Sequence, residues 1–224
     1  MTTPSDISSP STLRRSPFDH IFAAYTEPLP AVLRDHYLVS ADMSYRVVLE
    51  GTMDRIWHRP AWLWPVFWLL IWIDLLFPET GTQIPATMTV TGRRTSTDHD
   101  YQTWDRTFAF PARRRFNAIM VYDSEQNCVV ERLGPGHRLQ MAWAIRFLSP
   151  ASIEIVTTNC TLRLGRWRVQ LPHALYPSVR AVETALLDRP ATIHIDLAMT
   201  HVWLGPIFGY DGTFIVRHES IGAL

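Results

Sequence analysis

The sequence predicts a mainly β protein of the α+β class, folded as a strongly curved antiparallel sheet or a lipocalin-like barrel of about ten strands with N-terminal helices. From Thr87 to Arg217, short segments that alternate apolar with polar residues follow one another between turn residues, as in an antiparallel meander. Helical patterns are confined to the part of the chain before this region. No long helix follows the last alternating segment, so a helix-grip cup fits poorly.

Length and charge limit the function classes. The chain has 224 residues, which suits one domain with a sizeable core. We expect that domain to span residues 18–224. Residues 1–17 are rich in Ser, Thr and Pro and lack the apolar stretch of a signal peptide, which predicts a disordered leader. Lys and Arg number 21 against 21 Asp and Glu, and this balance argues against a nucleic-acid partner.

Absent motifs narrow the chemistry. The two cysteines, Cys128 and Cys160, have no Cys or His companions at metal-site spacing, which favours reduced thiols in a cytoplasmic protein and predicts no metal site. The chain also lacks glycine-rich nucleotide loops, the nucleophile elbow of serine hydrolases, the zinc-peptidase motif and paired redox cysteines. We therefore expect no cofactor, and we expect any catalysis to be acid–base or electrostatic.

Two segments before the alternating region have helical patterns. The first, Phe18–Tyr37, is interrupted by prolines. The second, Ala61–Phe77, carries one charged residue and is shorter than the ~20 apolar residues that a spanning helix needs. Its Trp64, Trp68 and Trp72 fall on one helical stripe.

Three interpretations of Ala61–Phe77 are open. We expect a helix buried in the core or lying over a cavity mouth. The second interpretation is an interfacial helix whose Trp stripe contacts a membrane surface, because tryptophan favours that zone. A spanning helix is the third.

The predicted strands are short and β-rich in composition. One precedes the Trp-rich segment and ten form the meander. They are Ser44–Gly51, Met88–Arg93, Tyr101–Phe110, Arg115–Tyr122, Cys128–Leu133, His137–Phe147, Ile153–Leu164, Trp167–Leu171, Val179–Leu187, Thr192–Leu204 and Thr213–His218.

The segment His137–Phe147 shows the clearest alternation. Its odd positions, from His137 onward, are mainly apolar, and its even positions are mostly polar or small. We expect the face with Met141 and Trp143 to point inward and Arg146 to point to solvent.

Polar residues on otherwise apolar strand faces are the remaining leads. Arg106 shares a face with Trp104 and Phe108, and Glu131 lies on the apolar face of its own strand. If both point inward they pair, because desolvating either charge alone costs several kcal/mol. An ion pair that fixes register explains them without a reaction, and a catalytic or ligand-orienting role is the alternative.

His201 lies between Met199 and Trp203 on the apolar face of its predicted strand. A satisfied core histidine is the plain interpretation. A proton shuttle is the functional one, since imidazole titrates near neutrality. Asp196 falls on the opposite face and is expected to point to solvent.

Five sequence pieces, taken in order, resemble one family. They are W-x-R-x-F from Trp104 to Phe108, E-R-x-G-P from Glu131 to Pro135, P-x-x-x-A-x-E from Pro177 to Glu183, an apolar-Asp-apolar triplet at Asp196, and G-x-x-x-x-Y-x-G from Gly205 to Gly212. From about Phe18 to Val216 the chain is similar to the family called domain of unknown function 4166, and His36 is similar to that family's opening. Gly134 and Gly205, each before a proline, are interpreted as turn residues.

The resemblance implies an architecture and candidate residues rather than a reaction. In the family this domain often follows a saccharopine-dehydrogenase-like or short-chain reductase domain, which implies work on or near a reductase's substrate. The Trp-rich segment departs from the family's shorter, more charged amphipathic helix. The matching polar or aromatic positions are Trp104, Arg106, Glu131, Arg132, Glu183, Asp196 and Tyr210.

The leading hypothesis is a protein that binds a small hydrophobic molecule, such as a lipid, terpenoid or polyketide-like compound, in an apolar barrel cavity lined by its many aromatic residues, nine Trp among them. The alternative is a cofactor-independent isomerase or cyclase of natural-product biosynthesis that uses the same cavity. A third is a peripheral membrane protein that contacts the bilayer through residues 61–77. Candidate catalytic residues are Glu131, Arg106, Glu183 and His201. Candidate ligand-binding residues are Trp104, Phe108, Met141, Trp143, Met199, Trp203 and Tyr210.

Overall fold

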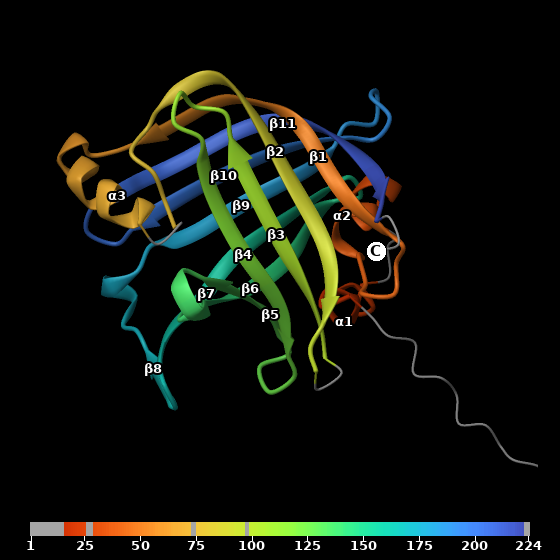
Figure 1. The fold of residues 1–224 in the computed structure, drawn as a ribbon, viewed down its shortest axis with the longest axis horizontal. Helices are drawn as coiled ribbons and strands as arrows, with labels where there is room; N and C mark the ends of the chain where they lie inside the picture. Colours follow the sequence, from red (N-terminus) through yellow and green to blue (C-terminus); the bar gives the residue numbers. More distant parts are fainter. Residues whose placement is uncertain (1–15, 26–28, 73–74, 97–98, 222–224) are drawn as a thin grey trace, which may run out of the picture.

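The protein folds as a closed antiparallel barrel (Figure 1). The structure, a computed structural model, describes residues 16–25, 29–72, 75–96 and 99–221. Within these ranges ten strands close the barrel in the order β6-β5-β4-β3-β2-β1-β11-β10-β9-β7, and β7 pairs with β6 to complete it. The eleventh strand, β8, forms a hairpin with the end of β7. The prediction of a barrel of about ten strands is therefore confirmed.

The strand bounds follow the chain order. The strands are β1 (Tyr45–His58), β2 (Gly81–Arg94), β3 (Asp100–Phe108), β4 (Arg114–Asp123), β5 (Cys128–Leu133), β6 (Leu139–Ser149), β7 (Ser152–Leu164), β8 (Trp167–Gln170), β9 (Ser178–Ala185), β10 (Thr192–His201) and β11 (Gly205–Ser220).

Residue alternation decides which side chains fill the barrel. In β6, Trp143 is 6% exposed while Arg146 points to solvent, as predicted. The predicted inward position of His137 is wrong, because β6 begins at Leu139. His137 instead ends a short 3-10 turn, η2 (Pro135–His137), with φ of 54°, and is exposed.

Strand ends depend on pairing that local sequence does not reveal. β1 continues past Gly51 to His58. A Cβ atom at Gly51 would lie 2.0 Å from the Thr213 carbonyl oxygen, so only glycine allows β11 to pair with β1 at this point. At the other extreme, the predicted strand Thr192–Leu204 stops at His201 and the following residues form a turn. Trp203 therefore lies outside the strand on which it was predicted.

Two short helices plug one end of the barrel. They are α1 (Asp19–Phe22) and α2 (Ala31–Tyr37), where one interrupted helix was predicted. The Gln102 amide of β3 holds the end of α2, donating from Nε2 to the Tyr37 carbonyl at 2.7 Å and to the Val39 carbonyl at 2.8 Å. Most of the predicted leader lies outside the described residues, but its Ser16 is buried and donates to the Tyr37 carbonyl at 2.7 Å.

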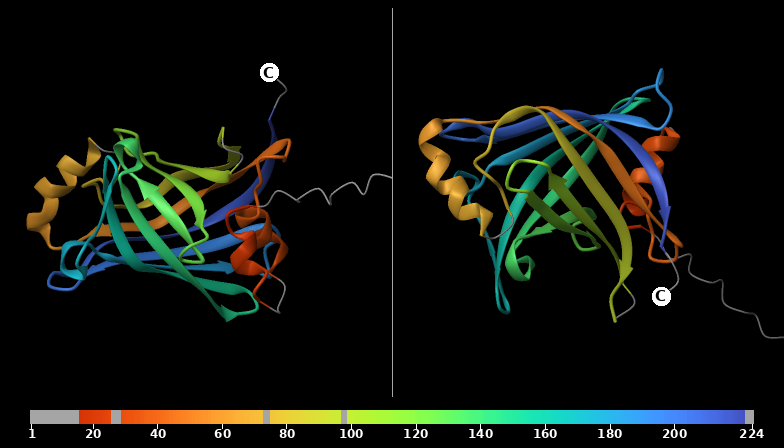
Figure 2. Two further views of the ribbon diagram at one scale, coloured as in Figure 1. Left: turned by 90° about the horizontal axis from the view of Figure 1, so that it is seen from below. Right: turned by 45° about the horizontal axis from the view of Figure 1, so that its top comes forward.

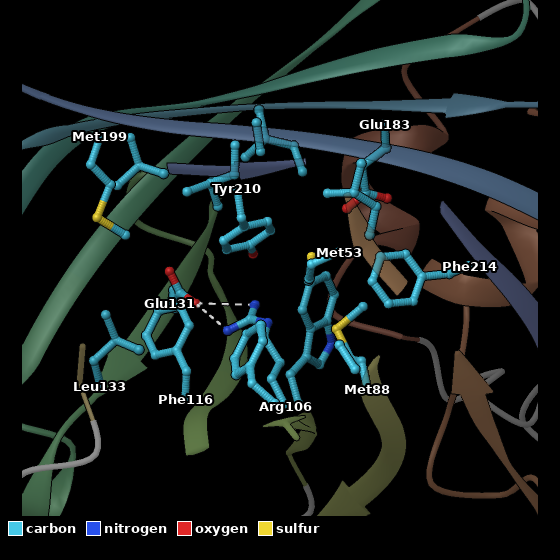
Figure 3. Close-up of a pocket in the computed structure, with 18 of the residues that line it drawn as sticks. Met53, Met88, Arg106, Phe116, Glu131, Leu133, Glu183, Met199, Tyr210 and Phe214 are labelled. Atoms are coloured by element: carbon cyan, nitrogen blue, oxygen red, sulfur yellow. Dashed lines mark hydrogen bonds and ion pairs between the residues drawn. The ribbon is translucent and has the colours of Figure 1, made fainter. Parts of the chain in front are cut away.

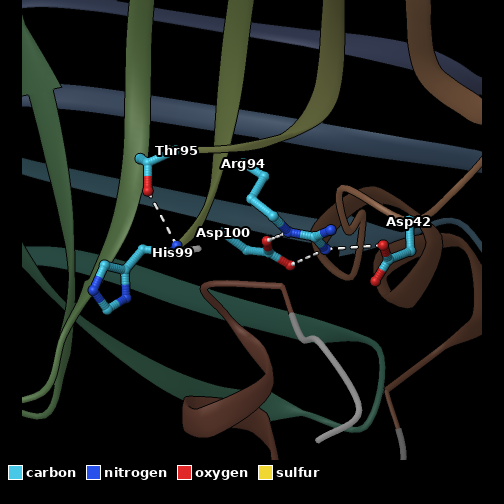
Figure 4. A network of polar contacts seen from close by, with 5 residues as sticks. All are labelled: Asp42, Arg94, Thr95, His99 and Asp100. Atoms are coloured by element: carbon cyan, nitrogen blue, oxygen red, sulfur yellow. Dashed lines mark hydrogen bonds and ion pairs between the residues drawn. The ribbon is translucent and has the colours of Figure 1, made fainter. Parts of the chain in front are cut away.

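The β2–β3 hairpin is tied to the chain that follows α2 (Figure 4). Arg94 donates from Nε to Asp100 Oδ1 at 2.8 Å and from Nη2 to Asp42 Oδ1 at 2.9 Å. The hydrogen bond to Asp100, followed by that to Asp42, raises the pKa of Arg94 above its usual range. Next to this network Gly92 lies under Ser40, whose carbonyl oxygen would be 2.1 Å from an added Cβ. The plug is thus fixed to the barrel wall.

The Trp-rich segment covers the opposite end of the barrel (Figures 1 and 2). The predicted helix Ala61–Phe77 is shorter than expected: a 3-10 turn, η1 (Ala61–Leu63), leads into α3 (Trp64–Ile71), and Leu75–Phe77 are not helical. Phe67 is buried against His58 and Phe208, with ring centroids 5.1 and 6.2 Å away.

Only the face of α3 with Phe67 packs on the barrel, because Trp64 and Trp68 on its other side are exposed. Among the described residues, no helix combines the length and apolarity needed to cross a bilayer.

Candidate functional site

The barrel interior holds two adjoining chambers. The inner chamber has a volume of about 60 Å³, and the mouth chamber, which lies beneath α3, has about 320 Å³. The mouth chamber is lined by apolar side chains together with Cys160 and Tyr176. The two chambers share wall residues Phe116, Leu133, Met141, Val179 and Met199.

Nine of the eleven sequence-predicted site residues line the inner chamber (Figure 3). They come from inward positions of β3, β5, β6, β9, β10 and β11, where strand alternation places them. They are Trp104, Arg106, Phe108, Glu131, Met141, Trp143, Glu183, Met199 and Tyr210.

The other two lie elsewhere. His201 hydrogen-bonds through Nε2 to the Ala174 carbonyl at 3.1 Å at the barrel rim, and Trp203 is 73% exposed in the β10–β11 turn. A register shift between Met199 and Thr200 ends the alternation that predicted both positions. Two further residues of the family pattern also lie outside the chamber: Arg132 is half-buried on the other face of β5, and Asp196 is exposed, as expected.

Arg106 and Glu131 form the predicted inward pair. Glu131 Oε1 accepts from Arg106 Nη1 at 3.4 Å and from Nη2 at 3.5 Å, so both bonds are long. The guanidinium also lies over the rings of Trp104 and Phe116, at 5.1 and 4.7 Å from their centroids. Burial raises the pKa of Glu131, while Arg106 and a hydrogen bond with the Trp143 side chain oppose the increase. The long bonds leave hydrogen-bonding capacity on both groups.

A second polar cluster lies where α2 meets β9. His36 Nε2 is 3.6 Å from Glu183 Oε2, and both side chains are at least 96% buried. Burial raises the pKa of Glu183 to about 7, despite the opposing effects of Tyr37 and Arg106. Burial and the charge of Arg106 lower the pKa of His36 to about 3, so its imidazole is neutral at neutral pH.

Several buried polar atoms of this cluster have no hydrogen-bond partner of normal geometry among the described residues. They are both ring nitrogens of His36, the Tyr37 hydroxyl and Glu183 Oε2. The Tyr37 hydroxyl lies close enough to Glu183 for the carboxyl group to help raise the pKa of Tyr37, after burial itself. Unsatisfied buried polar groups cost ~1–3 kcal/mol each, so further hydrogen-bonding groups at this cluster would stabilise the fold.

Sequence reasoning missed His36 and Tyr37 as site residues. The family resemblance pointed to His36 only as part of the opening pattern. No periodicity in α2 shows that the helix closes a barrel end, so its inward-facing ring could not be assigned. Within the described ranges no group of three or more His, Cys, Asp or Glu side chains is placed to hold a metal ion.

Fold and site together define an antiparallel barrel with one plugged end and an apolar chamber that leads to buried ionisable side chains. Within that class, the chain belongs to the family described as Domain of unknown function (DUF4166), whose model matches residues 29–214. The predicted family is thereby confirmed. The chain is also similar to the Uncharacterized protein YndH of Bacillus subtilis (strain 168), with 27% identity over 174 residues, covering 77% of this chain and 84% of YndH.

Proposed function

We propose that the protein binds a small hydrophobic molecule that carries a neutral oxygen group, with its apolar part in the mouth chamber and its oxygen at Arg106 and Glu131. The observation that carries the proposal is an apolar chamber of about 320 Å³ that shares five wall residues with a smaller chamber, which a buried charged pair lines. Small-molecule sites have this character, with a mainly apolar wall of ~300–1,000 Å³ and a few polar groups that fix orientation.

The charges favour an alcohol or ketone over a carboxylate. Arg106 already faces Glu131, and Glu183 supplies a second carboxyl group to the same chamber. A ligand carboxylate would place a third acidic group beside one guanidinium, which is unfavourable. A hydroxyl group accepts from Arg106 and donates to Glu131, so it satisfies both partners. Tyr210, whose pKa burial raises to about 12, stays a neutral hydrogen-bonding group in the same wall.

The proposal is tested by filling the junction between the chambers. Val179→Trp adds bulk where both chambers share a wall, and Ile215→Trp introduces the same side chain at an exposed position of β11. Displacement of a fluorescent apolar probe by dodecanol and by dodecanoate is measured for each protein. We expect dodecanol to displace the probe from the wild type and from Ile215→Trp. We expect Val179→Trp to bind neither the probe nor dodecanol. Glu131→Gln removes the carboxylate that would repel dodecanoate. We therefore expect this variant to show a smaller difference between its affinities for dodecanol and dodecanoate.

Mass spectrometry of a solvent extract of the purified protein supplies a second readout. An apolar compound with a hydroxyl or carbonyl group is expected in the wild-type extract and not in that of Val179→Trp. Equal probe binding by a folded Val179→Trp protein, together with an extract free of such a compound, overturns the proposal.

One observation favours an acid–base enzyme as the second candidate. Glu183 faces the chamber with a pKa of about 7, the value at which a carboxyl group both accepts and donates protons at neutral pH. An isomerase of this kind moves a proton from one ligand carbon to another, so incubating the extracted compound in D₂O introduces deuterium. Deuterium uptake that Glu183→Gln abolishes supports the enzyme, and an unchanged compound supports the carrier.

A further inference from the structure

Most of the tryptophan of this protein lies on one end of its surface. Six of the nine Trp residues are exposed, and only Trp104 and Trp143 line the inner chamber, which corrects the expectation that the tryptophans line the cavity. The exposed ones are Trp62 (63%), Trp64 (49%), Trp68 (40%), Trp72 (85%), Trp167 (65%) and Trp203 (73%).

These residues come from three separate connections at the end of the barrel that α3 covers (Figures 1 and 2). They are the β1–β2 connection with α3, the β7–β8 hairpin and the β10–β11 turn. The same segments wall the mouth chamber, through Phe67 of α3, Leu171 after β8 and Leu204 of the turn. We call the exposed tryptophans and the arginines of this end the mouth face.

The mouth face is basic although the chain as a whole has no net charge. Exposed arginines lie in or beside its connections: Arg59, Arg113, Arg115, Arg138, Arg163, Arg166 and Arg168. Glu79 is the single acidic residue among the described residues of these connections, and it pairs with Arg114. Arg114 also lies over the Trp68 ring, 5.6 Å from its centroid, which joins α3 to the barrel wall.

Like charges are crowded on the mouth face. Arg163 and Arg168 are direct cross-strand partners in the β7–β8 hairpin, an arrangement that destabilises a sheet. Arg132, on the adjoining barrel surface, has its pKa lowered by burial and then by the charges of Arg163 and Arg168. Folding gains nothing from this crowding, whereas an external anionic surface would neutralise it.

We propose that the mouth face docks on an anionic lipid bilayer, so that the cavity of the proposed function exchanges its ligand directly with the membrane. Tryptophan concentrates at the headgroup level of bilayers, and basic residues add attraction to anionic lipids. A second copy of this chain is the less suitable occupant, because two mouth faces would oppose arginines to arginines. The exchange of ligand with the membrane rests on the proposed function. Membrane docking itself is argued only from the exposed tryptophans and arginines.

Vesicle flotation tests the proposal. The full chain is mixed with vesicles of phosphatidylcholine alone or of phosphatidylcholine with phosphatidylglycerol. The apolar variant is Trp72→Ser with Trp203→Ser, and the charge variant is Arg166→Gln with Arg168→Gln. The controls change an exposed apolar residue and an exposed arginine at the opposite end, where Leu187 is 83% exposed and the Arg189 side chain 66%: Leu187→Ser and Arg189→Gln.

We expect the wild type and both controls to float with phosphatidylglycerol vesicles and to bind phosphatidylcholine much more weakly. Each arginine removed should lower the partition coefficient about five-fold. The Trp72→Ser, Trp203→Ser protein should bind more weakly to both vesicle types. Vesicle binding that is the same for both lipid compositions and unchanged in both variants overturns docking. Docking is also overturned if the protein sediments as a dimer and the same variants dissociate that dimer.

A separate measurement keeps the two proposals distinguishable. Dodecanol loading from solution is expected to be unchanged in the docking variants, because none of the four mutated residues lines either chamber. Intact vesicle binding with no loading overturns the proposed function alone. Intact loading with no vesicle binding overturns docking alone.

Discussion

At the scale of single residues, the inner chamber contains two contrasting acid groups. Glu131 faces a guanidinium that offsets part of its desolvation, whereas Glu183 faces a neutral histidine and the Tyr37 hydroxyl group. The two carboxyl groups therefore differ in their chemical properties. Glu131 is suited to hold a ligand's oxygen together with Arg106, and Glu183 is suited to bind or release a proton near neutral pH.

The stability of the protein should depend on pH through Glu183 and His36, with opposite signs. Folding raises the pKa of Glu183 from 4.5 to about 7, so its contribution is present below pH 4.5 and is lost as the pH rises towards 7. Folding lowers the pKa of His36 from 6.5 to about 3, so stability is lost as the pH falls below 6.5. Each group contributes a slope of up to ~1.4 kcal/mol per pH unit, and the two slopes oppose each other between pH 4.5 and 6.5.

Single substitutions separate the two slopes. In urea titrations across this pH range, Glu183→Gln should leave the His36 slope, so that the free energy of unfolding rises with pH. His36→Gln should leave the Glu183 slope, so that the free energy of unfolding falls with pH. Glu50→Gln, at a half-exposed carboxylate on β1, serves as the control and should follow the wild type. The same sign of slope in both variants would contradict the assignment.

At the scale of elements, β6 shows how a strand divides its residues between cavity and solvent. Trp143 lines the inner chamber at 6% exposure, and the Arg146 side chain is 67% exposed. Its nearest acidic partner, Glu154, is 4.0 Å away, which is too far for a strong pair.

Alanine substitutions in β6 test this register. Trp143→Ala should lower the free energy of unfolding by ~3–5 kcal/mol, because it removes a large buried side chain. Arg146→Ala should change it by less than ~0.5 kcal/mol. Urea midpoints measure both effects. Small effects of equal size at the two positions would contradict this register, and a large effect at Arg146 alone would indicate a strand shifted by one residue.

At the scale of the whole molecule, the barrel has two unlike ends. Buried aromatic side chains and the Arg94 network close the α1–α2 end, while the α3 end carries exposed tryptophans and arginines over the larger chamber. In the proposed function, the ligand therefore enters and leaves the cavity through the mouth face.

Ligand occupancy should raise the thermal stability of the whole barrel. A molecule that binds only the folded state at about 100 times its Kd adds about 2.7 kcal/mol. For a domain of this size the melting temperature then rises by roughly 5–10 °C. Scanning calorimetry of solvent-extracted protein with and without dodecanol measures the change. The same rise in Val179→Trp would show that dodecanol acts outside the chambers.

The sequence alone predicted a strongly curved sheet or barrel, most of the inward-facing residues and the inner polar pair. Alternation with a period of two residues separates the two faces of a strand, and this local property placed Arg106, Glu131 and Trp143 inside. The desolvation cost of single buried charges then required Arg106 and Glu131 to meet, as they do. The five family pieces also contain Glu183 and Tyr210, and both line the inner chamber.

Only the tertiary structure decided how the ends of the barrel are built. Alternation states which side of a strand a residue faces, but not how far along the barrel axis it lies or what covers the end. The contact between His36 and Glu183 was therefore not predicted. Trp203 does not lie on its predicted strand face, because β10 ends at His201. The spacing of the tryptophans in and next to α3 predicts that they share one helix face, but it does not predict whether that face is buried or exposed. Burial depends on packing between segments distant in sequence, and local patterns do not contain that information.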